Sequence, residues 1–316
     1  MDIKSFMPEE VECYEALRQI RWPDGVRCVK CGSDRVVKSG KWRNTPNQRY
    51  HCKDCDAWFN DKSGTVFESS RTELRYWFFI AFLMQFKVSV LEISRTLNMR
   101  YATVFELVKK LRQSVYAKAM VERLKGEVEI DEVYIKAGLK GRKKMKRGGR
   151  KRGLKARGRG TYDSDKVPVV AMVERGGKIR IRPHRNIKTK EIIDRYLNDV
   201  DPGAIVYTDD FSSYNALPSN RHRSINHSDG KYSDGNGVHI NTVEAEFSVY
   251  RPWMAIFRGV SKERLYLYCS HYELLRNNRR SNPVDRMLEM VKFLRLDPEF
   301  WTILWFYDKG LWNNWN

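Results

Sequence analysis

The sequence predicts a multidomain protein of the mixed α/β class, and three observations support this prediction. Two Cys-x-x-Cys pairs lie within the first 66 residues, which is typical of a small metal-stabilised module. Apolar residues recur with the 3.6-residue period of helices between about 70 and 115. From about residue 126 the apolar period changes to two, and predicted strands then alternate with predicted helices.

These changes of pattern divide the chain into four expected segments: a metal-binding ribbon, a helical module, an α/β module and a tail rich in tryptophan. Their expected ranges are 1–66, 67–125, 126–280 and 281–316. Acidic residues interrupt the tail, so packing on the core or on a second subunit is favoured over membrane contact. Its tryptophans are Trp301, Trp305, Trp312 and Trp315.

The charge of the chain indicates a polyanionic partner. Lysine and arginine number 59 against 39 acidic residues, which gives a net charge of +20. Such an excess favours nucleic acid over an acidic membrane surface. The chain lacks a signal-peptide pattern and an apolar run of the ~20 residues that a membrane span needs. We therefore expect a cytoplasmic, nucleoid-associated protein that binds DNA and no membrane.

The four paired cysteines predict a structural zinc site. Cys28 and Cys31 form one pair, Cys52 and Cys55 form the other, and 20 residues separate the pairs. Two thiolates on each of two tight turns supply the corners of a tetrahedron, and a closed four-thiolate shell leaves no position for catalysis. The basic residues of the ribbon favour a DNA contact, with a protein-contact module as the alternative. These residues are Lys30, Lys38, Lys41, Arg43 and Lys53.

The helical module has the outline of a helix-turn-helix. Apolar stripes at 90–97 and 104–111 are separated by the short break Asn98-Met99-Arg100. An ordinary helical bundle with a basic face is the alternative, but basic charge recurs on both sides of this module, which favours DNA binding. The second helix is expected to present six residues to DNA: Arg100, Tyr101, Thr103, Lys109, Lys110 and Arg112.

In the α/β module, a strand at 128–130 leads into Asp131, and its face carries three acids that need cations or water beside them. A hairpin is predicted at 167–182, around the Arg175-Gly176-Gly177 turn. A helix capped by Thr189 then leads to a strand at 204–208 that ends at Asp209. Residues from there to about 238 are predicted to be loop, and their histidines incidental.

A helix is predicted from Asn241 with Glu244 near its start, and Pro252 is expected to end or kink it. Another helix is expected at about 261–276. Between the first strand and the hairpin, residues 136–160 are dense in lysine, arginine and glycine, which favours a loop that clamps phosphates over a merely solvated segment. Its candidate DNA-binding residues are Arg142, Lys143, Lys144, Lys146, Arg147, Arg150, Lys151 and Arg152.

Asp131, Asp209 and Glu244 are the candidate catalytic centre. Three carboxylates gathered together repel one another unless a cation binds them, and oxygen ligands select hard ions such as Mg²⁺ or Mn²⁺. Two such ions support phosphodiester chemistry without a nucleophilic side chain. Arg251 lies two helical turns beyond Glu244, where it can hold a phosphate near the ions. Glu246 and Asp210 compete with Glu244 and Asp209 for their roles.

At these residues the sequence resembles the DDE transposases of bacterial insertion sequences, in particular the ISXO2-like group with an N-terminal zinc ribbon. The matching runs are EIDEVYI, DKVPVVAMVERGGKI, VYTDDFSSYNAL, VHINTVEAEFS and FRGVSKERLYLYCSHYELLRNNR. The resemblance implies an RNase H-like core with catalytic Asp131, Asp209 and Glu244. It also implies cleavage at the terminal inverted repeats of an element, strand transfer into target DNA, and a homodimer or higher multimer.

This chain departs from the group at Glu246-Phe247, where an aromatic pair is usual, and at Pro252, where the helix normally continues. Two alternatives to a transposase stay open at this point. One is a DNA-binding regulator that uses the ribbon and the helix-turn-helix and has a degenerate core. The other is an RNase H-like nuclease that hydrolyses DNA without joining strands.

Overall fold

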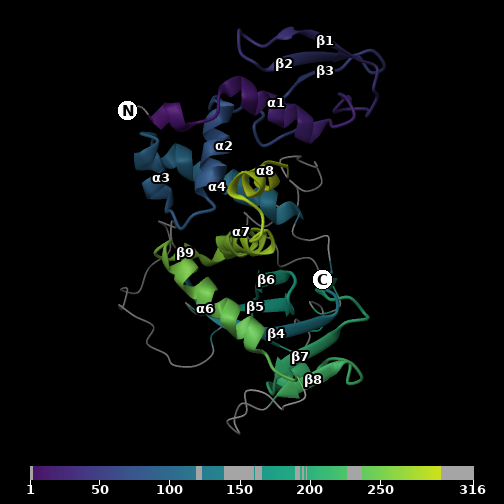
Figure 1. The fold of residues 1–316 in the computed structure, drawn as a ribbon, viewed down its shortest axis with the longest axis vertical. Coiled ribbons are helices and arrows are strands. Elements are labelled where there is room, and N and C mark those ends of the chain that lie inside the picture. The colour runs from purple at the N-terminus through teal and green to yellow at the C-terminus, as the bar shows by residue number, and fades with distance from the viewer. Residues whose placement is uncertain are drawn as a thin grey trace. The chain divides into compact units, whose positions relative to one another are not determined.

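The computed structural model describes residues 3–118, 123–138, 160, 166–188, 193, 196, 198–225 and 237–292. The chain divides into two units, one of Met1–Lys118 with Arg280–Asn316 and one of Ala119–Arg279 (Figure 1). Two sets of candidate residues lie outside the described ranges. They are the eight basic residues Arg142, Lys143, Lys144, Lys146, Arg147, Arg150, Lys151 and Arg152, and the tail residues Trp301, Trp305, Trp312 and Trp315.

The first unit begins with a helix and a three-stranded antiparallel sheet. Helix α1 covers Glu10–Arg21, and the strands are β1 (Val36–Lys41), β2 (Gln48–Cys52) and β3 (Trp58–Asn60). Trp22, Tyr50 and Phe59 pack together behind the sheet. The carboxylate of buried Asp61 joins α1 to the sheet, because it accepts hydrogen bonds from the Arg18 guanidinium and the Tyr50 hydroxyl.

Three further helices confirm the predicted apolar stripes. They are α2 (Leu74–Leu83), α3 (Val90–Thr96) and α4 (Tyr101–Lys118). Ser89 caps α3 by accepting a hydrogen bond from the Glu92 amide. Asn98 then takes a left-handed φ of 48°, and the Met99 amide donates to the Ser94 carbonyl at 3.0 Å. These contacts make the tight turn that separates the two helices of the predicted helix-turn-helix.

Part of the expected tail forms a helix of the first unit. Helix α8 covers Pro283–Lys292 and buries Met290 and Val291. The Gln85 side chain, just beyond α2, donates to the Pro283 carbonyl at 2.7 Å and accepts from Arg286 Nε at 2.9 Å. The chain therefore returns to its N-terminal unit after completing the second unit.

The second unit is built on a six-stranded mixed sheet. Its strands are β4 (Glu127–Gly138), β5 (Lys166–Glu174), β6 (Ile179–Pro183), β7 (Ile205–Asp209), β8 (His222–Ile225) and β9 (Val260–Ser261). The order is β6-β5-β4-β7-β8, with β9 on the far end of β4 (Figure 1). Strands β4, β5 and β6 are antiparallel neighbours, whereas β7 and β8 run parallel to β4. The mixed α/β class is thus confirmed, as is the hairpin around Gly176.

The prediction that residues 210–238 are all loop is wrong at β8. His222–Ile225 pairs with β7 along its length, and Thr208 Oγ1 lies 2.8 Å from His222 Nε2. The segment is short and mostly polar, so it lacks the apolar alternation by which a strand is recognised. Its strand conformation comes from pairing with β7 at the edge of the sheet.

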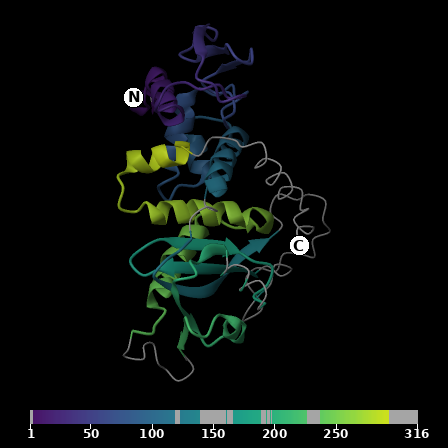
Figure 2. The same ribbon diagram turned by 90° about the vertical axis from the view of Figure 1, so that its right-hand side faces the viewer.

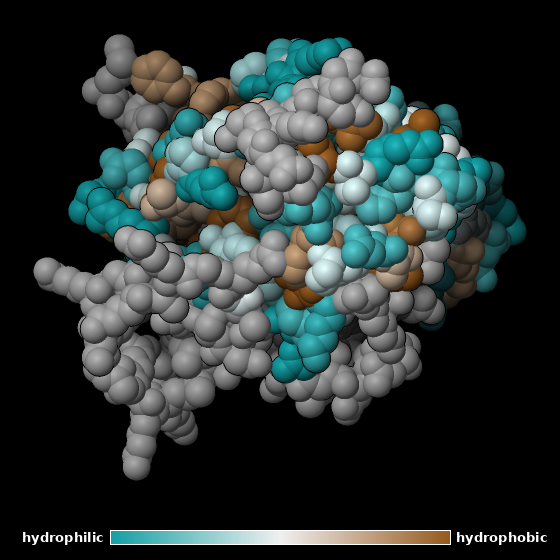
Figure 3. All heavy atoms as spheres, turned by 90° about the horizontal axis from the view of Figure 1, so that it is seen from below, coloured by the Kyte–Doolittle hydropathy of each residue, from teal (hydrophilic) through white to brown (hydrophobic). Residues whose placement is uncertain are grey.

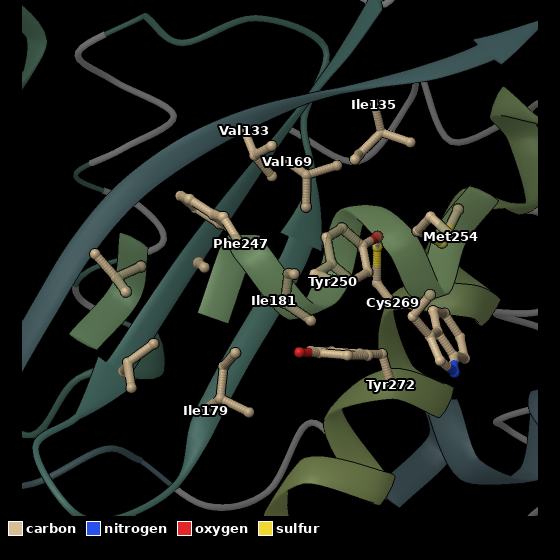
Figure 4. Close-up of a cluster of buried hydrophobic side chains, with 14 of the residues drawn as sticks. Val133, Ile135, Val169, Ile179, Ile181, Phe247, Tyr250, Met254, Cys269 and Tyr272 are labelled. Carbon is tan, nitrogen blue, oxygen red and sulfur yellow. Dashed lines mark hydrogen bonds between the residues drawn. The ribbon is translucent and has the colours of Figure 1, made fainter. Parts of the chain in front are cut away.

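Helices α6 (Asn241–Ala255) and α7 (Leu265–Asn277) cover one face of this sheet (Figures 1 and 2). Figure 4 shows their shared core, in which Phe247, Tyr250 and Tyr272 meet valines and isoleucines of β4, β5 and β6. The opposite face buries Tyr196, Tyr214 and other apolar residues. Since both faces bury apolar residues, the middle of β5 is apolar on both sides, whereas the first half of β4 carries the acids Glu127, Glu129, Asp131 and Glu132.

Pro252 does not end α6, because the helix runs on through it to Ala255. Loss of one hydrogen bond and a steric clash cost about 3 kcal/mol in a helix interior. The two residues that follow, Trp253 and Met254, are both buried in the core of the second unit. Burial of two such side chains stabilises the last turn by about 1.5–3 kcal/mol each, which offsets the cost.

The surface of the described residues is mixed in character. Figure 3 views the molecule from below Figure 1, and there apolar side chains form small areas separated by polar ones. None of the helices described is long and apolar enough to cross a membrane.

Candidate functional site

The four cysteines of the ribbon form a metal-binding group. Cys28 Sγ lies 3.5 Å from Cys55 Sγ, Cys31 Sγ lies 3.7 Å from Cys52 Sγ, and all four sulfurs lie within 4.8 Å of one another. A tetrahedral metal with metal–sulfur bonds of about 2.3 Å requires sulfurs about 3.8 Å apart. The thiols are free rather than paired as disulfides. The predicted ligands are therefore brought together in the geometry of a closed four-thiolate site.

Local backbone geometry places each pair of thiols. After Cys28 the chain turns tightly, with the Gly32 amide donating to the Cys28 carbonyl at 3.0 Å and Gly32 at a φ of 77°. Cys52 ends β2, and its amide donates to the Ala57 carbonyl at 3.0 Å. The two turns face each other because the β1–β2 pairing aligns Val36 with Cys52.

The outer face of the ribbon sheet carries exposed planar side chains. Trp42 is 44% exposed and Trp58 is 57% exposed. The Arg49 guanidinium lies 5.7 Å from the ring centre of Trp42 and 5.3 Å from that of Trp58. His51 stacks on Trp58 with ring centres 4.5 Å apart. We call these four residues the ribbon ladder, and it offers both positive charge and flat apolar surface.

The strand register brings two of the three candidate acids together. In the parallel β4–β7 pair, Glu129 lies opposite Tyr207. Continuing the same register by two residues sets Asp131 opposite Asp209, on strands about 4.8 Å apart. Both acids lie on the sheet face that α6 covers, since side chains two apart share a face and Tyr207 packs in that core. Among the described residues the four thiols form a group that could hold a metal ion, and the three carboxylates are not gathered into such a group.

The environment of Asp131 makes its ionised form unfavourable. Burial, together with the negative charges of Glu132, Asp209 and Glu244, raises the pKa of Asp131 to about 8, against a hydrogen bond from the Glu132 amide. That hydrogen bond reaches Asp131 Oδ1 at 2.7 Å. Asp209 Oδ1 accepts from the Phe211 amide at 3.1 Å. Crowded acids with a raised pKa are typical of a site that binds a cation.

Glu244 is better placed than Glu246 to be the third acid. Glu244 is exposed in the first turn of α6, and its charge acts on Asp131. Glu246 faces α7 instead, where it accepts hydrogen bonds from Arg276 and, at 3.0 Å, from the Tyr272 hydroxyl. The carboxylate of Glu246 is therefore occupied in joining two helices.

One functional candidate was not predicted. Glu129, two residues before Asp131 on β4, is fully buried. Its carboxylate accepts hydrogen bonds from the backbone amides of Thr242 at 2.8 Å and Val243 at 3.0 Å. These amides belong to the first turn of α6, immediately before Glu244. The sequence signal was the alternation of acids along this strand, but it does not distinguish the buried anchor from the candidate ligand.

Within the described ranges, most of the remaining predicted phosphate and DNA contacts are accessible. Arg251 is exposed on α6, with its guanidinium 5.9 Å from the ring centre of Phe247. Arg100 and Tyr101 are exposed at the start of α4, whereas Lys109 and Lys110 are partly exposed farther along it. Thr103, between these pairs, is also partly exposed.

Arg112 was expected to face outward, and that prediction is wrong because only 4% of it is exposed. Residues 111–116 are all buried, so this part of α4 has no outward face. The helical period of the sequence cannot show that a helix is covered on all sides.

Two regions match known protein families. Residues 8–57, which contain the four cysteines, match a transposase zinc-ribbon domain, and residues 123–275, which contain the three acids, match the ISXO2-like transposase domain. Over 281 residues the chain is 38% identical to an uncharacterised protein in the transposable element ISH50 of Halobacterium salinarum. That alignment covers 87% of this chain and 93% of the relative.

Proposed function

The chain belongs to the ISXO2-like transposases of insertion elements, and from this premise we propose that it cuts the ends of its element and transfers the freed strands to target DNA. Family membership also confirms the RNase H-like class of the second unit and the zinc-ribbon class of the N-terminal module. The observation that supports the proposal is the crowding of acids at Asp131: the β4–β7 register, continued by two residues, sets it opposite Asp209, and the charges of Asp209 and Glu244 raise its pKa.

Two kinds of metal ion fit the residues present. The four thiolates suit a structural zinc, because their sulfur separations match its tetrahedral geometry. Asp131, Asp209 and Glu244 offer only oxygen ligands, which suit Mg²⁺ or Mn²⁺. When bound there, a pair of such ions would activate an attacking water or 3′-hydroxyl and stabilise the leaving oxygen.

Several residues of the chain have proposed roles in this chemistry. Asp131 must lose the proton that its raised pKa retains before it can serve as a metal ligand. Arg251 is exposed on α6 and is long enough to hold a phosphate of the scissile strand. The start of α4 is available for groove contacts through Arg100 and Tyr101. Basic residues 142–152 are proposed to clamp phosphates, and they lie outside the described ranges.

We also propose that the ribbon ladder contacts DNA. Its Arg49 and flanking tryptophans combine positive charge with planar surfaces that pack on sugars and bases. In full-length protein, Trp58→Ala should weaken binding of element-end DNA roughly 5- to 50-fold. Arg49→Gln should reduce the slope of log affinity against log salt by about 0.9. Fluorescence anisotropy at several salt concentrations measures both effects.

The matched control for the ladder is Phe6→Ala, which removes another exposed aromatic side chain from the same unit. It should leave DNA affinity and its salt dependence unchanged. Unchanged affinity in Trp58→Ala as well would favour the protein-contact alternative for the ribbon.

The raised pKa of Asp131 predicts a pH-dependent stability. Between the ordinary carboxyl pKa and about 8, the folded chain retains a proton that the unfolded chain has lost, so stability falls as pH rises through this window. In zinc-loaded protein without added Mg²⁺, the melting temperature should drop by roughly 5–10 °C from pH 5 to pH 8. Added Mg²⁺ should reverse more of this drop at pH 8 than at pH 5.

Asp131→Asn tests the assignment of this pH dependence, because asparagine does not titrate. Without added Mg²⁺, the variant should lose the part of the drop that other groups do not cause, and Mg²⁺ should stabilise it little at pH 8. An identical pH profile in the variant and the parent protein would show that Asp131 is not responsible.

A strand-transfer assay tests the function as a whole. The protein is incubated with Mg²⁺, a labelled duplex that carries an inverted repeat of its element, and a target plasmid. Joined products are expected. Specific binding without nicking would favour the DNA-binding regulator, and nicking without joining would favour the nuclease. Because two ends must be held together, we propose that the active form is a dimer or higher multimer, which sedimentation of the DNA complex checks.

A further inference from the structure

We infer that Glu129 and Arg175 are positioning residues that hold the first turn of α6, and with it Glu244, at a fixed place beside Asp131. The inference rests on the proposed metal site of Asp131, Asp209 and Glu244. It assigns neither residue a direct contact with DNA or metal. Their proposed role is to keep a constant distance between two candidate ligands, Asp131 on strand β4 and Glu244 on helix α6.

Glu129 anchors the N-terminus of α6 with both carboxylate oxygens. Oε2 accepts from the amides of Thr242 and Val243, and Oε1 accepts from the Thr242 hydroxyl at 2.9 Å. The first amides of a helix have no partner within the helix, and its N-terminus favours a negative charge. Glu129 supplies both the acceptor and the charge from strand β4. Asp131 is two residues away on that strand, and Glu244 directly follows the anchored amides.

Arg175 balances the buried charge of Glu129 and ties it to the neighbouring elements. Its Nε donates to Glu129 Oε1 at 2.8 Å, and another nitrogen donates to Glu127 Oε2 at 3.2 Å. A third donates to the His239 carbonyl at 2.9 Å, just before α6. The guanidinium also stacks on Tyr207 of β7, 3.9 Å from the ring centre. One side chain thus contacts β4, β7 and the entry to α6.

Two more contacts close this network. The Tyr207 hydroxyl donates to Glu127 Oε1 at 2.8 Å, and the Tyr207 hydroxyl together with Arg175 lowers the pKa of Glu127. His239 Nδ1 lies 3.2 Å from Glu129 Oε1. Glu127 and Glu129 therefore each have positively charged or hydrogen-bond-donating partners within the protein. Asp131 differs from them, since neighbouring acids raise its pKa.

The β5–β6 turn is shaped to present Arg175. The Gly177 amide donates to the Glu174 carbonyl at 3.0 Å, and Gly176 takes a left-handed φ of 73°. A Cβ at Gly177 would lie 2.7 Å from Glu174 Cβ, so a side chain there would displace the turn. The Arg175 amide donates to the Glu127 carbonyl at 2.9 Å, which fixes the arginine at the start of β4. The two glycines thereby serve the placement of this arginine.

A buried ion pair can also be purely structural, and the same unit contains a matched example. Glu273 of α7 is buried and pairs with Arg180 and Arg182 of β6. It joins a helix to the sheet as Glu129 does, but it has no contact with α6 or with the candidate ligands in the described contacts. Glu273→Gln therefore measures what loss of a buried carboxylate costs apart from the site.

The test compares Glu129→Gln, Arg175→Lys and Glu273→Gln in full-length, zinc-loaded protein. Binding of Mn²⁺ alone is measured by calorimetry at pH 8, and cleavage of element-end DNA is measured over a Mn²⁺ titration. Glu129→Gln and Arg175→Lys should each weaken Mn²⁺ binding and raise its half-saturating concentration in cleavage about 10- to 100-fold. Their affinity for DNA should be unchanged. Glu273→Gln should lower the melting temperature without either effect.

Thr242→Val gives a milder variant in case Glu129→Gln does not fold, since it removes one hydrogen bond to Glu129 and no charge. It should shift Mn²⁺ affinity in the same direction by a smaller factor. If Glu129→Gln, Arg175→Lys and Thr242→Val all bind Mn²⁺ as the parent does while Asp131→Asn is inactive, the inference is overturned but the proposed function is not. Undiminished Mn²⁺ binding and cleavage in Asp131→Asn would overturn the proposed function, and the inference with it.

Discussion

Alanine in place of Asp131, Asp209 or Glu244 is expected to reduce Mg²⁺-dependent cleavage of element-end DNA by at least about 10²–10³-fold. Each substitution removes an oxygen ligand from the pair of ions that the proposed mechanism requires. DNA affinity should change little, because the proposed contacts to phosphates and bases lie in other parts of the chain. Single-turnover cleavage with saturating protein separates the two effects.

Two neighbouring acids serve as controls for this experiment. Asp210 is exposed beside Asp209, and Asp210→Ala should retain cleavage. Glu246→Gln loses charge from the contact with Arg276 and should lower the melting temperature while retaining cleavage near the parent rate. Loss of cleavage in Glu246→Gln with full cleavage in Glu244→Ala would show that Glu246 is the third acid.

Removal of zinc should unfold the ribbon. Zinc binding to four thiolates contributes on the order of 10 kcal/mol to the folding of small modules, which have too little apolar core to fold without it. The core behind this sheet is small, and two of its buried members, Cys28 and Cys52, are themselves candidate zinc ligands. A strong chelator or Cys52→Ser should therefore expose residues 8–57 to hydrogen exchange and proteolysis, and should abolish the contribution of the ribbon ladder to DNA binding.

The matched control is Cys13→Ala, because Cys13 is a buried cysteine of the same unit outside the metal group. It should leave the zinc content at one ion per chain and the ribbon protected from exchange. Protection of residues 8–57 that persists in the chelated protein would contradict a structural role for zinc.

Sequence pattern predicted the elements whose burial follows a local period. The stripes of α2, α3 and α4 and the β5–β6 hairpin are of this kind. The metal-binding group was predicted from another local signal, the spacing of the four cysteines. Helix α1 and strand β8 were not predicted. Helix α1 is joined to the sheet by Arg18 and Asp61, a polar contact between residues 43 positions apart, and β8 depends on its pairing with β7.

The candidate acids were named from the sequence, but the residues that hold them in place were not. Asp131, Asp209 and Glu244 were named from strand ends, a helix start and a family resemblance. The acids before Asp131 look equivalent in the sequence, and only the bonds of Glu129 to residues 113 and 114 positions away distinguish it as an anchor. The choice between Glu244 and Glu246 likewise depends on Arg276, which belongs to another helix.

The chain returns to the first unit at α8, and this has a consequence for the synthesis of the protein. The first unit is discontinuous, because residues 119–279 are inserted between its α4 and its α8. A ribosome therefore completes the whole RNase H-like unit before it releases the helix that buries Met290 and Val291 in the first unit. Nascent chains that stop short of α8 contain the complete second unit and a helical bundle that lacks its last helix, so we expect the proposed DNA binding by this bundle to be acquired last.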